Sequence, residues 1–375
     1  MKILIIVNAV SFLISHRFEI ACGARDSGFE VHIAADTESS EEPAVLRTAG
    51  FHFHRIRLRR GGLNPIHDFL YLQQLFTLIR RIRPQIVHNV TVKPVVYGSF
   101  AARAAGVPGI VNAVSGLGYA FSGGKSRRLL SELVKGAYRL SLNQRRVRVI
   151  FQNEDDIHTF VEAGVIDGGQ AVLIKGSGVD LNEFSVEDEV NGEPLVVMPA
   201  RMLRDKGVME FTEAAELLRA RGSQARFIMA GKIDRGNPAG LREEELTELA
   251  RRSGAEWVGH VKDMPSLYKK SHIVCLPSYR EGLPKSLIEA CAAGRAIVTT
   301  DVPGCRDVVR HSENGLLVPP RDGGALAAAL KVLLDDAALR RKMGLAGRAR
   351  AEAEFDVRTV VRATLGVYEA ALAAR

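Results

Sequence analysis

The stretch from Pro277 to Glu289 reads P-S-Y-R-E-G-L-P-K-S-L-I-E, and it follows a short apolar run, 273–276. Proline is favoured at the first position of a helix, so the sequence predicts a helix that begins between Pro284 and Ser286. The first amides of such a helix, together with its dipole, attract a phosphate group. Glu281 precedes this helix, and Glu289 lies a little over two turns farther on. Two carboxylates beside an anion site indicate recognition of hydroxyl groups, as on the sugar and the ribose of a nucleotide-sugar.

The length and composition of the chain predict two globular domains. It has 375 residues, of which 46% are hydrophobic and 25% charged, and this length exceeds the usual size of one domain. The apolar run Ile3–Val7 is too short to span a membrane, so we expect a first strand rather than a signal. The cysteines lack metal-ligand spacing and are predicted to be reduced thiols of a cytosolic protein: Cys22, Cys275, Cys291 and Cys305.

Positive charge is concentrated in the first half of the chain. Residues 44–150 contain 18 Lys and Arg but only two acidic residues, a net charge of +16, whereas the rest of the chain carries −8. This asymmetry predicts an anionic partner for the first half. A phospholipid surface, a lipid-linked diphosphate and a nucleic acid all fit the charge.

Two series of alternating strands and helices indicate an α/β fold with two doubly wound domains, 1–186 and 194–356. The first series predicts a loop at 10–15, strands at 2–10, 30–35, 51–58, 85–91, 109–114 and 147–152, and helices at 16–27, 66–81 and 94–105. A polar break at 187–194 separates it from strands at 195–200, 225–230, 257–258, 272–276, 296–300 and 315–318, followed by helices at 326–334, 337–353 and 357–373.

Three further groups of residues follow predicted strands of the second domain, where such sheets bind ligands. Arg201 and Lys206 lie in P-A-R-M-L-R-D-K-G, and their charges suit the negative charge that grows on a departing nucleotide diphosphate. Gly231 and Lys232 lie in A-G-K, where a glycine allows close backbone approach. His260 and Val261 end W-V-G-H-V.

The motif P-S-x-x-E-G-x-P-x-S-x-x-E, with Arg-x4-Lys upstream, resembles the donor signature of the glycosyltransferase 4 group. That resemblance covers nearly the whole chain and implies the GT-B fold, in which two Rossmann-like domains face each other over a cleft. It implies a last helix, 357–375, that crosses back to the first domain. Arg201 and Lys206 would then clamp the diphosphate, while Glu281 would bind the donor sugar and Glu289 the ribose. The remaining donor-binding residues would be Gly282, Leu283, Pro284, Lys285, Ser286, Gly231, Lys232, His260 and Val261.

The first domain carries the predicted acceptor side. His16 stands at a predicted helix start after a loop with Ser11 and Phe12, and we expect it to touch the acceptor or the donor sugar. Many members of the family carry a histidine in the loop where this chain has Ser115, Gly116, Leu117 and Gly118. The G-L-G loop resembles a subgroup that acts on polyprenyl-diphosphate-linked sugars, including N-acetylgalactosaminyltransferases. The predicted contacts with acceptor or membrane also include basic residues of the strand 51–58 region and of an amphipathic helix within 125–148: Arg59, Arg60, Arg127 and Arg128.

The resemblance implies a retaining transferase that moves a sugar, an N-acetylhexosamine by the subgroup likeness, from a UDP-sugar to an undecaprenyl-diphosphate-linked saccharide. We expect no cofactor and no metal, because no D-x-D cluster follows a strand. We expect a cytoplasmic protein bound peripherally to the cytoplasmic face of the inner membrane, with no specific nucleic-acid partner. The alternatives are a nucleotide-sugar epimerase of the same architecture, a nucleic-acid-binding protein that uses residues 44–150, and a non-catalytic sugar-binding relative.

Overall fold

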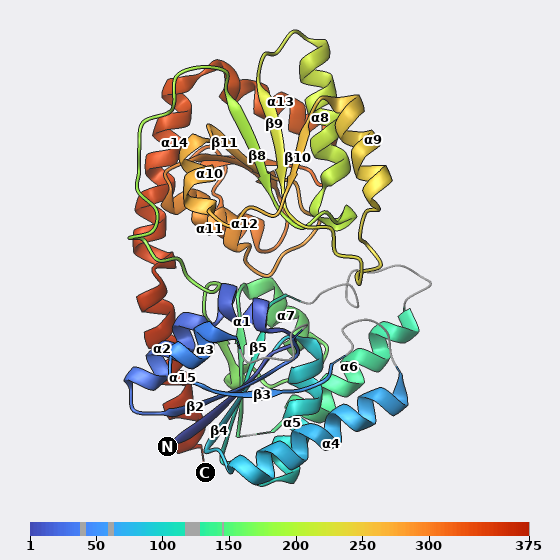
Figure 1. The fold of residues 1–375 in the computed structure, drawn as a ribbon, viewed down its shortest axis with the longest axis vertical. Helices are drawn as coiled ribbons and strands as arrows, with labels where there is room; N and C mark the ends of the chain where they lie inside the picture. Colours follow the sequence, from blue (N-terminus) through green and yellow to red (C-terminus); the bar gives the residue numbers. More distant parts are fainter. Residues whose placement is uncertain (38–42, 59–63, 117–127, 145, 375) are drawn as a thin grey trace. The chain divides into compact units, whose positions relative to one another are not determined.

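A computed structural model describes residues 1–37, 43–58, 64–116, 128–144 and 146–374, with the backbone alone for residues 128–131. The chain divides into two compact units (Figure 1). The first comprises Met1–Ser177 together with Arg358–Arg375, and the second comprises Gly178–Val357. Both units are parallel sheets covered by helices on both faces, so the predicted α/β architecture of two Rossmann-like domains is confirmed.

The sheet of the first unit has the strand order β3-β2-β1-β4-β5-β6-β7. Its strands are largely buried on both faces, which explains their continuous apolar sequences. They are β1 (Lys2–Ile6), β2 (Glu30–Ala35), β3 (His52–Arg55), β4 (Ile86–Val90), β5 (Gly109–Val114), β6 (Val147–Phe151) and β7 (Ala171–Leu173).

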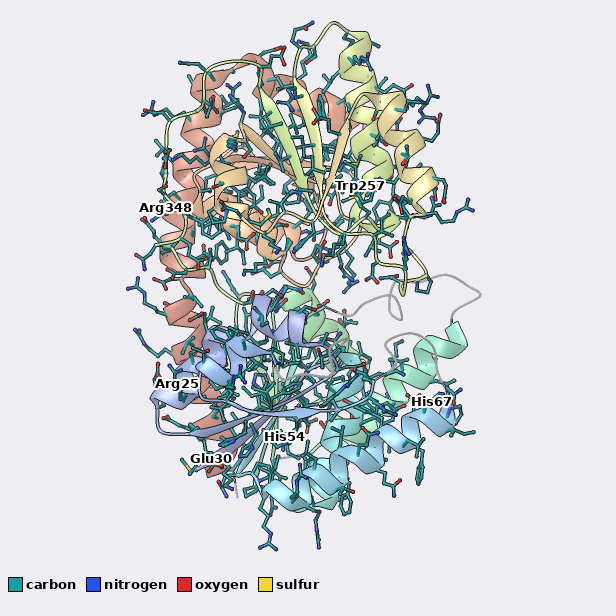
Figure 2. All side chains as sticks on the ribbon, viewed as in Figure 1. Arg25, Glu30, His54, His67, Trp257 and Arg348 are labelled. Carbon is teal, nitrogen blue, oxygen red and sulfur yellow. The ribbon has the colours of Figure 1, made fainter. Side chains whose placement is uncertain are left out.

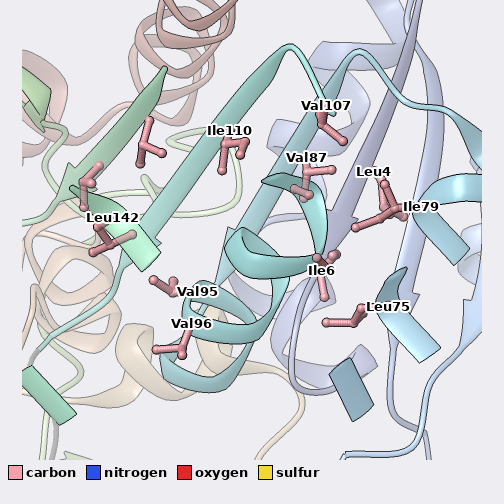
Figure 3. Close-up of a cluster of buried hydrophobic side chains, with 14 of the residues drawn as sticks. Leu4, Ile6, Leu75, Ile79, Val87, Val95, Val96, Val107, Ile110 and Leu142 are labelled. Atoms are coloured by element: carbon pink, nitrogen blue, oxygen red, sulfur yellow. The ribbon is translucent and has the colours of Figure 1, made fainter. Parts of the chain in front are cut away.

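Helices on the two faces bury two separate cores. The first core joins β1 to α4 through Leu4, Ile6, Leu75 and Ile79 (Figure 3), and the second packs α2 and α15 on the opposite face. The helices of this unit are α1 (Val10–His16), α2 (Phe18–Asp26), α3 (Ala44–Thr48), α4 (Pro65–Ile82), the π-helical turn η1 (Pro94–Gly98), α5 (Ser99–Ala104), α6 (Arg128–Leu142), α7 (Glu154–Glu162), the 3₁₀ turn η3 (Gly168–Gln170) and α15 (Val357–Ala373).

The sheet of the second unit has the order β10-β9-β8-β11-β12-β13. Its strands are β8 (Leu195–Pro199), β9 (Arg226–Ala230), β10 (Glu256–Gly259), β11 (Ile273–Leu276), β12 (Ala296–Thr300) and β13 (Gly315–Val318). Its helices are the 3₁₀ turn η4 (Arg204–Lys206), α8 (Val208–Ala220), α9 (Glu243–Ser253), α10 (Met264–Lys270), α11 (Lys285–Ala292), α12 (Cys305–Val308), α13 (Gly323–Asp335), α14 (Ala337–Arg350) and the π-helical turn η5 (Ala351–Phe355).

Three features differ from, or add to, the sequence predictions. Residues 10–15, expected to be a loop, form most of α1, because Val10 and Leu13 lie one turn apart and both are buried. Residues 178–186, assigned to the first domain, lie in the second unit, where Val179 and Phe184 join a buried apolar cluster. The last helix packs on the first unit through Val360, Val367 and Ala371. Throughout the ranges given above, no helix has the length and apolarity that crossing a membrane requires.

Candidate active site

The candidate donor site lies in loops at the carboxyl edge of the second sheet, where parallel α/β sheets bind ligands. Glu281 lies in the loop between β11 and α11, and its side chain is only 11% exposed. Ser278 donates its hydroxyl hydrogen to Glu281 Oε1 over 2.6 Å, and Lys206 of η4 donates to the same oxygen. Two residues predicted separately and 75 positions apart in the sequence therefore form one ion pair.

The second predicted cation also has a carboxylate partner. Arg201 Nη1 lies 2.6 Å from Oδ2 of Asp234, which follows β9. The sequence analysis did not single out Asp234, because nothing local marks a carboxylate that lies 33 residues from its partner. Both cations of the predicted diphosphate clamp are thus neutralised by carboxylates, and a bound phosphate would have to compete with these carboxylates.

Helix α11 begins at Lys285, within the interval predicted from the sequence. Pro284 is the residue before the helix, with φ −72° and ψ 117°, and Lys285 is the first helical residue. The first intrahelical bond runs from the Leu287 amide to the Pro284 carbonyl over 3.1 Å. The amides of Lys285 and Ser286 precede that bond and lie at the positive dipole end of the helix, which favours an anion.

Glu289 is held inside the same helix region. Its Oε2 lies 3.1 Å from the hydroxyl of Tyr268 on α10, and its Oε1 lies 3.4 Å from Lys285 Nζ. Burial raises the pKa of the Glu289 carboxyl, while Lys285 and the Tyr268 hydrogen bond act in the opposite direction. Tyr268, fully buried and not predicted from the sequence, fixes the orientation of this carboxylate.

Glycines allow three loops of this edge to pack closely. A Cβ on Gly207 would lie 2.1 Å from the Pro277 carbonyl oxygen, and one on Gly304 would lie 2.6 Å from the carbonyl oxygens of Glu281 and Gly282. A Cβ on Gly231 would lie 1.7 Å from the Ala200 carbonyl oxygen. The close approach expected at Gly231 is therefore already made with the end of β8, inside the protein.

A tryptophan of β10 is hydrogen-bonded to the loop after β9. Trp257 of β10, labelled in Figure 2, donates its indole hydrogen to the Gly231 carbonyl over 2.9 Å. Lys232 and His260 are exposed nearby, and burial, followed by the charges of Lys232 and Lys262, lowers the pKa of His260. Val261 instead packs against a small apolar cluster of β8 and β9.

In the first unit, a buried arginine connects two of the predicted acceptor residues. His16 is the last residue of α1, not the first residue of the following helix, and its ring stacks on Phe12 with centroids 4.4 Å apart. Arg17 donates to the His16 carbonyl over 2.9 Å and to the Ser115 hydroxyl over 3.2 Å. Burial lowers the pKa of the Arg17 guanidinium to about 10. Gly116 follows with φ +106°, a conformation that favours glycine.

A groove of about 490 Å³ lies at the carboxyl ends of β2 and β3. Its lining combines Arg55, Arg57 and His67 with two carboxylates and with apolar residues that include Leu58 and Leu70. The carboxylates are Asp36 and Asp68, and Asp68 is paired with Lys93 at 2.8 Å. Beside it, the first turns of α4 expose Ile66 (72%) and Phe69 (65%). Helix α6 exposes Leu133 and Leu140 but buries Tyr138, so its apolar residues do not all face the core. Five of the predicted contacts lie outside the described residues, as does the side chain of Arg128: Arg59, Arg60, Leu117, Gly118 and Arg127.

Comparison with known proteins identifies the class. Residues 180–350 match the family model described as glycosyl transferases group 1, and residues 2–153 match the one described as glycosyl transferase 4-like. The first match contains the pairs Lys206–Glu281 and Arg201–Asp234. With two Rossmann-like sheets and these two matches, the chain belongs to the glycosyltransferases of the GT-B fold.

The chain is also similar to individual proteins of known activity or structure. The chain is 28% identical, over 98% of both chains, to the N,N'-diacetylbacillosaminyl-diphospho-undecaprenol α-1,3-N-acetylgalactosaminyltransferase of Campylobacter jejuni. It is 24% identical, over 74% of its own length and 73% of the relative's, to an Escherichia coli UDP-Gal:α-D-GlcNAc-diphosphoundecaprenol α-1,3-galactosyltransferase. Its fold is similar to that of Anabaena HepE, solved in complex with UDP and glucose, with a TM-score of 0.80, 18% identity and 98% coverage of both chains.

Proposed function

We propose that this glycosyltransferase moves a sugar, with retention of configuration, from a UDP-sugar to an undecaprenyl-diphosphate-linked saccharide. The observation that carries the proposal is the pairing of Lys206 with Glu281 beside the start of α11, at the carboxyl edge of the second sheet. The names of the Campylobacter and Escherichia coli relatives support the class of acceptor. The first of these names also supports an N-acetylhexosamine as the transferred sugar.

On the donor side, the diphosphate takes the place of Asp234 at Arg201 and lies against the first amides of α11. Arg201 holds a phosphate through its planar fork, and Lys206 adds a point charge. As the sugar departs, these fixed cations stabilise the negative charge that develops on the leaving phosphate. The two cations perform the task for which other transferases use a divalent ion, so we propose a metal-independent reaction. The leaving phosphate accepts the proton of the attacking hydroxyl, and Glu281 binds hydroxyls of the donor sugar.

On the acceptor side, the groove beside α4 suits an amphipathic diphosphate lipid. Arg55 and Arg57 provide cations for the diphosphate, and Leu58 and Leu70 provide apolar contacts. Ile66 and Phe69 project from the adjacent turns of α4 and suit the acyl region of a bilayer. We therefore propose peripheral attachment to an anionic membrane surface, the cytoplasmic face in a bacterial cell.

The test is a transfer assay with a panel of UDP-sugars and synthetic undecaprenyl-diphosphate-linked saccharides. We expect one UDP-sugar to yield an elongated lipid-linked saccharide. NMR should show that the new glycosidic bond has the same anomeric configuration as the sugar had in the donor. The yield should be the same in excess EDTA. Arg201→Ala should abolish most of this transfer, whereas Arg226→Ala, at the amino end of β9, should not.

Other outcomes would contradict parts of the proposal. Conversion of the UDP-sugar into its epimer without an acceptor would identify the alternative enzyme class. Binding of a UDP-sugar without any turnover would identify a non-catalytic relative. Loss of transfer in EDTA would overturn the metal-independent mechanism alone.

A further inference from the structure

The amino ends of β2 and β3 bring together a carboxylate and three imidazoles, which are side chains of the kinds that coordinate metal ions. Glu30 and His32 lie on β2, and the register pairs His32 with His52 on β3, the edge strand of the sheet. His54 follows two residues after His52, so the alternation of the strand places it on the same face. Figure 2 labels Glu30 and His54 in this part of the first unit. The group lies at the opposite ends of these strands from the groove of Arg55 and Arg57.

The distances within the group fit a tetrahedral metal ion. Glu30 Oε1 lies 3.0 Å from His32 Nε2 and 3.7 Å from His52 Nε2, and the three ligand atoms lie within 4.8 Å of one another. Metal–ligand bonds of about 2.1 Å place the ligand atoms of a tetrahedral site roughly 3.4 Å apart. Small side-chain adjustments would therefore bring these atoms around one ion.

A further histidine holds the buried ligand in place. His32 is only 7% exposed, and its Nδ1 lies 3.0 Å from His54 Nε2. The rings of His32 and His52 stack with centroids 4.7 Å apart. A hydrogen bond at the second ring nitrogen is the usual device that orients a histidine ligand. His54 occupies that position here.

Two cations border the group, and one of them, Lys2, competes with a metal for Glu30. Lys2 Nζ lies 3.5 Å from Glu30 Oε1, and Arg81 Nη2 lies 3.4 Å from His54 Nδ1. Lys2 is 41% exposed, so it can leave Glu30 for solvent when an ion binds. The positive charge of Lys2 lowers the affinity of the group for any cation, so removal of this charge should raise the affinity for a metal ion.

We propose that Glu30, His32 and His52 form a binding site for one divalent transition-metal ion of the Zn²⁺ class, which links the edge strand β3 to β2. Two imidazole nitrogens and one carboxylate oxygen are ligands that Zn²⁺, Co²⁺ and Cu²⁺ accept, whereas Mg²⁺ and Ca²⁺ prefer oxygen alone. His52 is exposed and gives the ion a path from solvent, with water as the fourth ligand.

The test is calorimetric titration of the untagged, metal-free full chain with ZnCl₂, with the Co²⁺ absorption spectrum as a second measurement. We expect one equivalent to bind, a tetrahedral Co²⁺ spectrum, and a higher melting temperature with Zn²⁺. Glu30→Gln and His52→Ala should each weaken binding by at least about tenfold, and His54→Ala by about tenfold. Lys2→Ala should bind Zn²⁺ more tightly than the wild type. The control is His158→Ala, which changes a histidine of α7 far from this group in the sequence and should have the Zn²⁺ affinity of the wild type.

His52→Ala is the decisive variant. Because the His52 side chain is exposed, its removal should leave the protein folded, so a loss of Zn²⁺ binding would report on the site itself. MgCl₂ serves as the ion control and should give no heat. The proposal is overturned if the wild type binds no Zn²⁺, or if Glu30→Gln and His52→Ala bind it as well as His158→Ala does. None of these outcomes depends on sugar transfer.

Discussion

The hydroxyl of Tyr268 lies 3.1 Å from Oε2 of Glu289, so a residue of α10 positions the predicted ribose ligand of α11. The same hydroxyl lies 3.1 Å from the Ser286 carbonyl oxygen. Because Tyr268 is fully buried, it holds Glu289 in one orientation before any ligand arrives. Such pre-orientation reduces the entropy that binding would otherwise cost.

Removing that hydroxyl should therefore weaken nucleotide binding without abolishing it. One hydrogen bond contributes about 1 kcal/mol, so Tyr268→Phe should reduce the affinity for UDP about fivefold in calorimetric titration. Glu289→Gln should reduce it further. Tyr138→Phe changes an equally buried tyrosine of the first unit and is the control. If wild type and Glu289→Gln had equal affinity for UDP, the predicted contact of Glu289 with the nucleotide would be wrong.

The two cations should affect catalysis much more than binding. We expect Arg201→Ala and Lys206→Ala each to lower kcat about 10²–10³-fold, the loss typical when one group that stabilises transition-state charge is removed. Arg226→Ala removes an exposed arginine paired with Glu256 and should leave kcat unchanged. Asp234→Asn should retain transfer, because Asp234 only pairs with Arg201 in the free protein. Steady-state kinetics with the preferred UDP-sugar measure all four variants.

Gly304 should be essential for the position of the Glu281 loop. It has φ +82°, and a Cβ there would lie 2.6 Å from two carbonyl oxygens. Gly222 has a similar φ of +84°, but a Cβ there would meet no atom of the described residues within 4 Å, so Gly222→Ala measures backbone strain alone. We expect about 1 kcal/mol of destabilisation for Gly222→Ala and roughly 1–3 kcal/mol more for Gly304→Ala. Only Gly304→Ala should weaken UDP binding. Chemical denaturation measures the free energy of unfolding of both variants, and calorimetric titration measures their affinity for UDP.

His88 should make the first unit sensitive to acid. Its Nδ1 lies 2.7 Å from the Tyr368 hydroxyl of α15, and burial, with a smaller contribution from Arg17, lowers its pKa to about 3. The unfolded chain binds a proton at His88 below about pH 6.5, whereas the folded chain does not, so stability falls as the pH falls through this window. The loss reaches about 3 kcal/mol near pH 4. His88→Gln should flatten the pH dependence of the melting temperature relative to wild type, and His158→Gln should leave it unchanged.

The exposed apolar residues of α4 should contribute to membrane attachment. Burial of one large apolar side chain contributes about 1.5–3 kcal/mol, so Phe69→Ser should reduce sedimentation with anionic vesicles by at least tenfold. Ile66→Ser should act in the same direction. Val332→Ser, at an apolar residue of α13 that is also half exposed, is the control. Vesicles without anionic lipid should bind the wild type weakly; equal binding by Phe69→Ser and Val332→Ser would contradict the proposed surface.

The sequence predicted elements best where the signal is local. Strands 30–35, 109–114, 296–300 and 315–318 were predicted with the bounds that the structure has, because buried parallel strands are short apolar runs between breaks. The helix at 10–16 was missed, since seven residues show too few turns to establish a helical period.

For the site, local patterns selected Arg201, Lys206, Glu281 and Glu289 but not their partners. Asp234 and Tyr268 lie 33 and 21 residues from the side chains they bind, and only the tertiary fold brings them there. Arg17 was not predicted for the same reason, because its guanidinium binds the hydroxyl of Ser115, which lies 98 positions away in the sequence. Partners of this kind carry no signature in sequence spacing.

The hydrogen bond from Trp257 to the Gly231 carbonyl has a practical consequence. Trp257 is the single tryptophan in the sequence, and its indole is bound to a loop at the proposed nucleotide site. Excitation of indole alone therefore reports on one place in the molecule, without any label. We therefore expect binding of a UDP-sugar at the proposed site to change the emission of this natural fluorophore, and stopped-flow experiments can measure how fast the donor binds and dissociates.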